Sequence, residues 1–310
     1  MAVLSKEELK MEIGGATQAP PRVSIGMPVY NGDKYVRDAL DSLLAQTFSN
    51  FELIISDNGS TDKTSSICEE YAKRDARILY VKQSENKGAV TNFQFVLDRA
   101  RGEFFMWAAY DDLWAKNYLR DALALLNEEN IEFVFPTFSV RSIKLNIGKK
   151  FGGEIFRFIE STNRQQRVLQ FLVLHHASHK CNIVYSLFKA EFLRCALKIQ
   201  DISNDGVLGA VILGLGRGKI LDGAMFRKRY PGLWPGALSS FFAWYYKNHS
   251  KEFELAKDVA LNNFDVLFPE YINEIRVIFD HYQPFTYEKC YRICSIDSGQ
   301  SRQGGNNGSK

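Results

Sequence analysis

Short apolar runs alternate with segments of helical periodicity over the first 136 residues of the chain. The runs are typical of buried strands, and they lie at 23–27, 51–56, 77–81, 103–108 and 131–136. The segments between them repeat apolar residues every three or four positions, which predicts helices at 34–46, 61–73, 89–99 and 116–127. Strands and helices that alternate in this way predict βαβ units, and therefore an α/β fold with a mostly parallel sheet covered on both faces.

The pattern becomes less regular after residue 147. Periodicity predicts helices at 165–176, 189–197, 206–215, 239–249 and 251–282, and the run CNIVYSL predicts a strand at 181–187. We therefore expect four regions, with the second divided at residue 128 into a regular and a less regular half. They are an N-terminal helix and linker at 1–21, an α/β domain at 22–235 (halves 22–128 and 129–235), a helical extension at 236–297 and a disordered polar tail at 298–310.

Composition narrows the class of protein without indicating its chemistry. The 310 residues are 45% hydrophobic and 24% charged, which is enough to bury a sizeable core. A net charge of +3 argues against a dedicated nucleic-acid binder, and no apolar run reaches the ~18 residues of a membrane span. Five scattered cysteines without a CxxC pair favour a reduced, cytoplasmic setting.

Polar residues follow the first two predicted strands directly. Pro28, Tyr30 and Asn31 come after the first strand, and Asp57 and Asn58 come after the second. In parallel sheets, ligands bind at the carboxyl ends of the strands, so these residues are candidates for contacts with a nucleotide. Asp57 is expected to be free to accept a uracil imide proton or to bond a ribose. The alternative is a plain turn at Pro28 and ordinary capping of the helix after Asp57.

A pair of carboxylates follows the fourth predicted strand in the sequence Trp107-Ala-Ala-Tyr110-Asp111-Asp112. Adjacent carboxylates are costly unless a cation neutralises them, and hard oxygen ligands suit Mg²⁺ or Mn²⁺. Asp111 and Asp112 are therefore candidate metal ligands. The alternative is that they cap the helix that starts near Lys116.

These sites together resemble the nucleotide-sugar domain of family 2 glycosyltransferases of the GT-A fold, over about residues 22–128. The segments that carry the resemblance are PRVSIGMPVYNGDKYVRDALDSLLAQTF, FELIISDNGSTDKT and SENKGAVTNFQFVLDRARGEFFMWAAYDD. The resemblance implies a Rossmann-like sheet, an inverting transfer from a nucleotide-diphosphate sugar, most simply a UDP-sugar, and a Mn²⁺ or Mg²⁺ cofactor. The nucleotide-binding residues expected on this basis are Pro28, Tyr30, Asn31, Asp57, Asn58, Gly88, Asn92, Tyr110 and Asp111.

One position departs from the family pattern. The first aspartate of the family's DxD metal motif is Ala109 in this chain, and Asp111 corresponds to the second. A branch of the family reads W-A-A-x-D-D here. Metal binding is then expected to rest on Asp111, the diphosphate oxygens and Asp112.

The second half carries a weaker resemblance. Asp205 lies where inverting members keep the carboxylate that takes the acceptor's proton, with Asp201 as the substitute and helix capping as the alternative. Arg227 and Arg229 lie in a basic segment that would meet the diphosphate, or else form an exposed basic loop. The family often has histidine at the position of Tyr230.

Three further patterns resemble known sites. The glycine-rich stretch at 214–218 follows a predicted helix instead of a strand, so it predicts a helix end and not a phosphate loop. His175, His176 and His179 lack the acidic residue of a zinc protease motif and are expected to be structural or acceptor-side. The aromatic cluster at 241–246 indicates core packing, or else a platform for a lipid-linked acceptor or a membrane surface.

The resulting expectation is a transferase that acts on a glycan or lipid-linked acceptor in polysaccharide assembly. It would work in the cytoplasm, including the inner face of the membrane, with peripheral membrane contact and homo-oligomerisation left open. Two alternatives remain: a sugar nucleotidyltransferase, and a non-catalytic protein that binds nucleotide sugars. The first normally needs a glycine-rich basic loop after the first strand, which PVYNGDKY is not. The second is kept open by Ala109.

Overall fold

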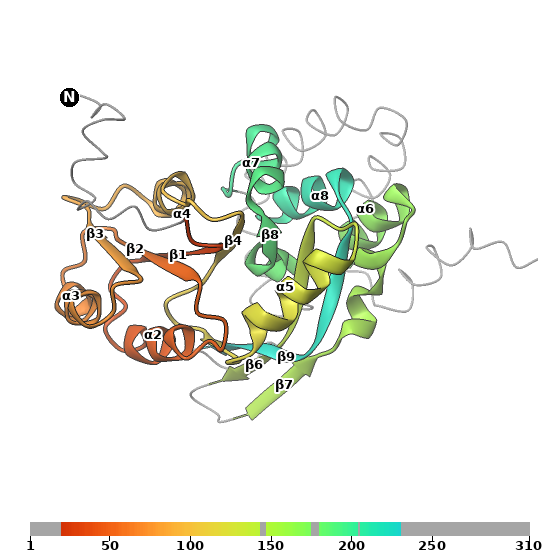
Figure 1. The fold of residues 1–310 in the computed structure, drawn as a ribbon. Coiled ribbons are helices and arrows are strands. Elements are labelled where there is room, and N and C mark those ends of the chain that lie inside the picture. Colours follow the sequence, from red (N-terminus) through yellow and green to blue (C-terminus); the bar gives the residue numbers. More distant parts are fainter. Residues whose placement is uncertain (1–19, 143–146, 175–179, 204, 231–310) are drawn as a thin grey trace, which may run out of the picture.

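A computed structural model describes residues 20–142, 147–174, 180–203 and 205–230 (Figure 1). The predicted helices at 239–249 and 251–282, the N-terminal helix, the polar tail, the three histidines and the aromatic cluster lie outside these residues. The first half confirms the predicted alternation of strands and helices. Its elements are β1 (Val23–Val29), α2 (Val36–Leu44), β2 (Phe51–Asp57), α3 (Thr64–Arg74), β3 (Ile78–Lys82), α4 (Ala89–Asp98), β4 (Phe104–Trp107), β5 (Leu113–Trp114) and α5 (Tyr118–Glu128).

The second half mixes strands, 3₁₀-helices and helices. Its elements are β6 (Phe133–Ser142), β7 (Ile147–Phe151), η1 (Gly153–Glu160), α6 (Arg164–Val173), η3 (Lys180–Tyr185), β8 (Leu187–Lys189), α7 (Ala190–Ile199), α8 (Asp205–Leu215) and β9 (Gly218–Tyr230). One expectation is wrong here. Residues 181–187 do not form a strand, because 181–185 belong to η3 and strand pairing begins only at Leu187. The basic segment at Arg227–Arg229 belongs to strand β9, so the alternative of an exposed loop does not hold for it. The stretch at 214–218 contains the end of helix α8, at Leu215, as expected.

One mixed sheet of nine strands runs through the described residues in the order β3-β2-β1-β4-β8-β6-β9-β5, with β7 paired to β6. The pairings of β1 with β2 and β4, of β2 with β3, and of β6 with β9 are parallel, and most of the paired positions belong to them. The shorter β4–β8 and β5–β9 pairings are antiparallel. Because β1, β2 and β4 are parallel neighbours, their carboxyl ends lie side by side at one edge of the sheet.

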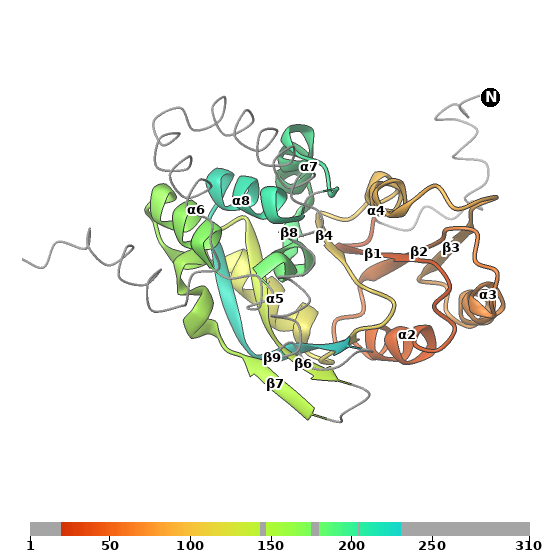
Figure 2. The same cartoon turned by 180° about the vertical axis from the view of Figure 1, so that it is seen from behind.

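Helices cover both faces of the sheet, as Figure 1 shows and Figure 2 confirms from behind. Helices α2 and α3 lie on one face of β1–β3 and α4 on the other, while α6, α7 and α8 pack together beside β8. All seven residues of both β1 and β2 are buried, so these strands have an apolar face toward each helical layer. A core of this kind fixes the strand ends that carry the polar residues.

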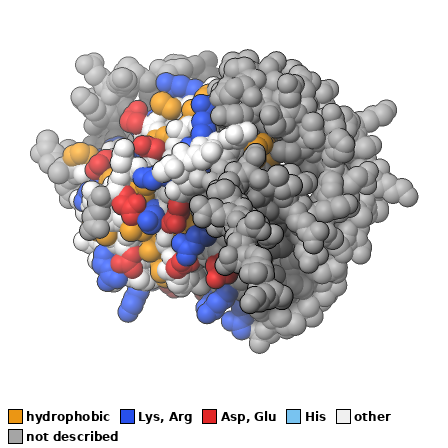
Figure 3. Space-filling model, turned by 90° about the vertical axis from the view of Figure 1, so that its right-hand side faces the viewer, with side chains coloured by type: hydrophobic (Ala, Val, Ile, Leu, Met, Phe, Trp, Pro, Cys, Tyr) orange, Lys and Arg blue, Asp and Glu red, His pale blue; other side chains and the backbone are white. Residues whose placement is uncertain are grey.

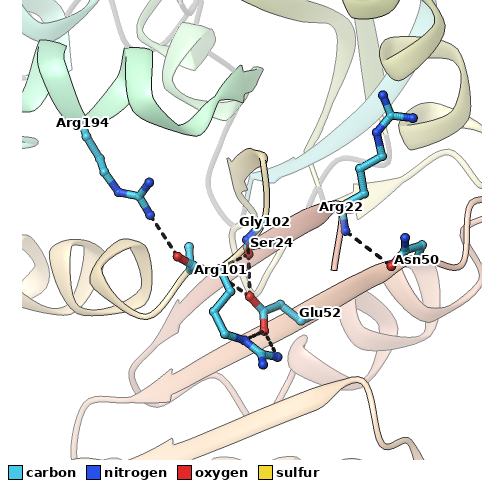
Figure 4. A network of polar contacts seen from close by, with 8 residues as sticks. Arg22, Ser24, Asn50, Glu52, Arg101, Gly102 and Arg194 are labelled. Carbon is cyan, nitrogen blue, oxygen red and sulfur yellow. Dashed lines mark hydrogen bonds and ion pairs between the residues drawn. The ribbon is translucent and has the colours of Figure 1, made fainter. Parts of the chain in front are cut away.

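A buried carboxylate joins the amino ends of the same strands (Figure 4). Glu52 is 4% exposed; it accepts hydrogen bonds from the Ser24 hydroxyl at 2.6 Å and from the Arg101 amide at 2.9 Å, and it pairs with the Arg101 guanidinium at 2.7 Å. The Ser24 hydroxyl also accepts the Gly102 amide at 2.8 Å. These contacts hold β1, β2 and the turn into β4 together at the edge opposite the candidate site.

Charged side chains of both signs are interspersed on the described part of the surface seen in Figure 3. This distribution agrees with the net charge of +3 for the whole chain. Among the described helices, none is both long and apolar enough to cross a bilayer.

Candidate functional site

The turn after β1 is held by side chains from the segment that precedes α3. Asn31 has a positive φ of 49°, a conformation that asparagine tolerates better than most residues. The Asn31 amide donates to the Ser60 hydroxyl at 2.9 Å, and the Asn31 side chain accepts the Thr61 amide at 2.9 Å. The next two amides, of Gly32 and Asp33, donate to Thr64 at 2.8 Å and to Asp62 at 3.1 Å. This turn is therefore rigid, and its amides are already paired.

Tyr30 and Tyr110 provide aromatic surface at this turn. Tyr30 is 40% exposed, and Tyr110 is partly buried. A Cβ on Gly32 would lie 2.5 Å from the Tyr110 ring, so glycine is required for the turn to approach the loop after β4. Pro28 is buried within β1 opposite Ser56. A flat ligand could reach Tyr30, whereas Pro28 supports the strand beneath it.

Asp57 is not free, contrary to expectation. Its side chain is fully buried and accepts three hydrogen bonds. The Ser60 amide donates at 2.9 Å, the Ser65 hydroxyl at 2.6 Å and the Tyr80 hydroxyl at 3.0 Å. The sequence does not reveal these partners, because Ser65 and Tyr80 approach Asp57 from α3 and β3. Asp62 separately accepts the Thr64 amide at 2.9 Å. Asp57 thus joins the end of β2 to α3 and β3.

Asn58 fixes the loop that precedes α4. Its side-chain amide donates to Asn86 at 2.8 Å and to the Gly88 carbonyl at 3.1 Å, and its oxygen accepts the Lys87 amide at 3.0 Å. Gly88 has a φ of 84°, a conformation that favours glycine. Asn92 is buried and donates to the Ser56 carbonyl at 3.0 Å. These residues join the end of β2 to α4 and to the loop before it.

The two carboxylates after β4 differ in their surroundings. Asp112 is 1% exposed; one oxygen accepts the Arg229 amide at 3.1 Å, and the other lies 3.7 Å from the Lys228 ammonium without a hydrogen bond. Burial raises the pKa of Asp112 to about 6, although Lys228 acts to lower it. Asp111 is only partly buried, and its carboxylate has no hydrogen-bond partner among the described residues.

Lys228 brings the two halves of the chain together. It lies on β9 with its side chain 26% exposed, and its ammonium is 5.0 Å from the centroid of the Tyr185 ring. Burial acts to lower the pKa of Lys228, but Tyr185, Asp112, Asp111 and Asp205 outweigh it and raise the pKa above its usual value. Asp112 from the first half and Tyr185 from the second therefore both lie beside the same ammonium.

Asp205 is the first residue of α8, and its side chain is exposed. No hydrogen bond or ion pair engages its carboxylate within the described part of the chain. The substitute candidate Asp201 instead accepts the Ser203 amide at 3.0 Å and the Gln200 side chain at 3.2 Å. The two carboxylates therefore differ in that Asp201 is bonded within its own turn.

Arg229 and Arg227 have different environments although they are two residues apart. The Arg229 guanidinium pairs with Asp38 at 2.6 Å, donates to the Tyr35 carbonyl at 3.0 Å and also donates to the Asp111 carbonyl. Through these contacts Arg229 joins β9 to α2 and to the loop that carries Asp111 and Asp112. Arg227 is exposed, and no described residue forms an ion pair with it.

Some of these side chains could bind a divalent cation. No group of three or more histidine, cysteine, aspartate or glutamate side chains gathers as a metal site in the described residues. Asp111 offers a partly exposed carboxylate without a protein partner, which fits a Mg²⁺ or Mn²⁺ ion whose other ligands come from substrate phosphates and water. Asp112 fits less well, since one of its oxygens is bonded and the other faces an ammonium.

Lys228 and Tyr185 were not among the predicted site residues. The sequence does hold one indication of Lys228. It lies two residues after Phe226, and alternate residues of a strand share a face. Phe226 is buried, with its ring centroid 6.1 Å from that of Tyr185. This argument holds only for a strand, and a loop at Arg227–Arg229 would not place the two side chains on one face.

Comparisons with known proteins identify the family of the chain. The family model described as "Glycosyl transferase family 2" matches residues 24–188, just over half of the 310-residue chain. An uncharacterized glycosyltransferase of Rickettsia typhi is 40% identical over 108 residues, which is 35% of this chain and 33% of that protein. TuaG of Bacillus subtilis, named as a teichuronic acid biosynthesis glycosyltransferase, is 36% identical over 124 residues, or 40% of this chain and 49% of that protein. The chain thus spans a third to a half of these relatives.

Solved structures share the fold. TarS of S. aureus in complex with UDP-GlcNAc superposes with a TM-score of 0.53 at 19% identity, covering 68% of this chain and 59% of that one. The mannosyltransferase PcManGT of Pyrobaculum calidifontis, in complex with GDP-Man and Mn²⁺, has a TM-score of 0.53 at 16% identity and covers 88% of this chain and 74% of that one. The mixed, mostly parallel sheet flanked by helices is the GT-A arrangement.

Proposed function

The chain belongs to glycosyl transferase family 2, and from that premise we propose that it transfers a sugar from a UDP-sugar to a hydroxyl of a glycan or lipid-linked acceptor. One observation carries the proposal: the Lys228 ammonium lies 3.7 Å from Asp112, which follows Asp111 at the end of β4, and 5.0 Å from the centroid of the Tyr185 ring in the second half. A leaving group held near Asp111 and an acceptor held near Asp205 would then meet in one site.

The first half would bind the donor. We propose that the exposed ring of Tyr30 stacks on the base, with Asn31 and Tyr110 beside it, while Asp57, Asn58, Gly88 and Asn92 hold the walls in place. Uridine is favoured because TarS, which shares the fold, binds UDP-GlcNAc, although PcManGT binds GDP-Man. Pro28 would act through the strand, since it is buried.

The diphosphate would lie against Asp111 and the exposed Arg227. A divalent ion, Mn²⁺ in the PcManGT complex, would neutralise charge on the leaving diphosphate. Asp111 would contribute a carboxylate oxygen to that ion, and Asp112 would hold β9 against the loop through the Arg229 amide. Arg229 would keep the Asp111 backbone in position instead of contacting the donor.

Asp205 would act as the general base. Its carboxylate would take the proton from the acceptor hydroxyl while the hydroxyl oxygen attacks the anomeric carbon and the bond from that carbon to the diphosphate oxygen breaks. A single displacement of this kind inverts the anomeric centre. The name of TuaG supports a cell-surface polysaccharide as the acceptor, and a cytoplasmic site of synthesis would follow from nucleotide-sugar use.

The turn after β1 argues against the nucleotidyltransferase alternative. Such enzymes wrap free amides of that turn around a triphosphate. Here the amides of Asn31, Gly32 and Asp33 all donate to side chains of the segment before α3. A triphosphate would have to displace these bonds.

Product analysis tests the proposed function. The protein is incubated with UDP-, GDP-, CDP- and dTDP-sugars and an acceptor panel, in Mn²⁺, in Mg²⁺ or in EDTA. A transferase releases a nucleoside diphosphate, whereas a nucleotidyltransferase supplied with pyrophosphate forms a nucleoside triphosphate and a sugar phosphate. Nucleotide binding without either product would favour the non-catalytic alternative.

A further inference from the structure

The segment that follows helix α2 carries a buried glutamine outside the candidate site. Gln46 is 6% exposed, and both polar atoms of its side chain are hydrogen-bonded. Its amide nitrogen donates to the Ala115 carbonyl at 2.7 Å, and its amide oxygen accepts the Leu119 amide at 3.0 Å. Ala115 follows β5 directly, and Leu119 lies in the first turn of α5. One side chain therefore joins the end of α2 to the segment where β5 leads into α5.

Gln46 also caps α5. The first amides of a helix have no partner inside it, and the side chain of the residue before the helix usually accepts one of them. Asn117 occupies that position, and its side chain makes no capping bond. The Leu119 amide bonds instead to Gln46, which lies 73 positions earlier in the chain. The start of α5 is therefore fixed by a side chain from the first βα unit.

Two further hydrogen bonds join the end of α2 to the same segment. The Ser42 hydroxyl accepts the Trp114 amide at 3.1 Å and donates to the Ala39 carbonyl at 2.8 Å. The Thr47 amide donates to the Lys116 carbonyl at 2.7 Å. Strand β5 has only two residues, so its own pairing with β9 is short. The bonds from α2 therefore supply much of what holds this segment in place.

The segment held in this way follows the two carboxylates of the candidate site directly. Residues 108–112 form a loop, and its first amide, of Ala108, donates to the Gly26 carbonyl on β1 at 2.9 Å. Its other end, Asp112, precedes the first residue of β5. A chain segment this short can move only as far as its two ends allow. The Asp111 carboxylate has no hydrogen-bond partner among the described residues, so the backbone of the loop determines where it lies.

We propose that Gln46 is a positioning residue, which holds the loop in the place from which Asp111 can bind a metal ion on the donor diphosphate. The inference rests on the proposed donor site, and it adds a residue after α2 that acts through Ala115 and Leu119. Loss of Gln46 should therefore spare the contacts with the base and the ribose. It should weaken the contacts that depend on Asp111.

Hydrogen exchange followed by mass spectrometry tests the positioning in the full chain without ligand, in EDTA. Q46M keeps the length of the side chain and loses both bonds, so we expect the amides of 108–119 to exchange at least about tenfold faster. N163A is the matched control, because Asn163 caps α6 by accepting the Gln166 amide at 3.0 Å. That variant should speed exchange only at the start of α6. Equal exchange of 108–119 in Q46M and the unsubstituted protein would overturn the proposal.

Calorimetric titration with UDP and UMP, in Mn²⁺ and in EDTA, tests the consequence for binding. The gain in UDP affinity that Mn²⁺ provides should fall at least about tenfold in Q46M and about fivefold in S42A, which loses one bond of the same set. N163A should keep the full gain. UMP affinity should stay within about threefold in all three variants, because the base and ribose contacts remain.

Three binding results would overturn the proposal. They are a full Mn²⁺ gain in Q46M, a UDP affinity of the unsubstituted protein that does not depend on Mn²⁺, and a parallel loss of UMP affinity, which would assign Gln46 a purely structural role. If Q46M does not fold, a full gain in S42A overturns it instead. If the unsubstituted protein binds no uridine nucleotide in either buffer, the proposed function itself fails, whereas the exchange experiment still shows whether Gln46 holds the loop.

Discussion

Carboxylates at the strand ends of this protein differ in how many donors they face, and this decides what each can do. Asp57 accepts three hydrogen bonds in a fully buried position, so its charge is balanced by the protein. Asp111 and Asp205 have no such partners among the described residues. A carboxylate without partners can bind a cation or accept a proton, whereas one with three partners stabilises the fold.

Replacing Asp57 should therefore cost stability as well as affinity. We expect D57A to lower the free energy of unfolding by about 3 kcal/mol, because the Ser60 amide and the Ser65 and Tyr80 hydroxyls lose their acceptor. Urea denaturation measures this change. D33A is the control, since the backbone amide of Asp33, which donates to Asp62 at 3.1 Å, is kept in that variant. Equal midpoints for D57A and the unsubstituted protein would mean that the three bonds contribute nothing.

Cysteine reactivity should follow burial. Burial raises the pKa of the Cys68 thiol to about 12, so it remains protonated at pH 8, whereas Cys195 is exposed. In a brief treatment with iodoacetamide at pH 8, peptide mass spectrometry should find Cys195 alkylated and Cys68 protected by at least about tenfold. Both should react in denaturant. Equal rates in the native protein would contradict the burial of Cys68.

The amino ends and the carboxyl ends of the parallel strands have different roles. The amino ends are joined by the Glu52 network of Figure 4, and the carboxyl ends carry the candidate site. Strand β4 is only four residues long, so its start at Phe104 and its end at Trp107 are closely linked. A Cβ on Gly102 would lie 2.6 Å from the Ser24 amide nitrogen, which leaves the turn into β4 little freedom. The network therefore helps to position the loop of Asp111.

Loss of the Glu52 network should destabilise the fold. We expect E52A to lower the free energy of unfolding by about 3 kcal/mol, because the Ser24 hydroxyl, the Arg101 amide and the Arg101 guanidinium lose an acceptor. E103A is matched to it: Glu103 also pairs with an arginine, Arg22 at 3.6 Å, but its side chain is 65% exposed. That variant should change stability by less than about 0.5 kcal/mol. Similar effects of E52A and E103A in urea denaturation would argue against the network.

Elements buried on both faces could be predicted from the sequence, and others could not. Strands β1 and β2 are continuous apolar runs because helices cover both sides. Strand β9 carries Arg227, Lys228 and Arg229 at its end, and a run of three cations resembles a loop unless its partners are known. Its pairing with β6 and with β5 is a contact between distant parts of the chain that periodicity does not encode.

At the scale of the whole molecule, β9 connects the halves. Arg229 pairs with Asp38, 191 positions away, and its backbone amide donates a hydrogen bond to the Asp112 carboxylate. The donor residues could be located from motifs because they follow consecutive strands of one regular half. Lys228 and Tyr185 could not, because their place depends on how β9 and η3 pack against that half. The partners of Asp57 were missed for a related reason: Ser65 and Tyr80 approach it from α3 and β3.

Arg229 should therefore matter for both stability and ligand binding. We expect R229A to lower the free energy of unfolding by about 2 kcal/mol and to weaken Mn²⁺-dependent UDP binding, because the Asp111 backbone loses a donor. Urea denaturation and calorimetry measure the two effects. R120A removes an exposed pair with the neighbouring Asp121 and should change neither. Unchanged UDP affinity in R229A would show that the loop is positioned by other contacts.

The central claim is that Asp205 works with a donor site built by the first half of the chain. The most direct measurement is the rate of nucleoside diphosphate release from the preferred nucleotide sugar and acceptor for the unsubstituted protein, D205N and D201N, with donor affinity measured on the same samples. We expect D205N to lose at least about a hundredfold in rate at unchanged donor affinity. D201N should keep a rate within about twofold, because Asp201 is bonded within its own turn. A D205N protein that turns over at a near-normal rate would contradict the account.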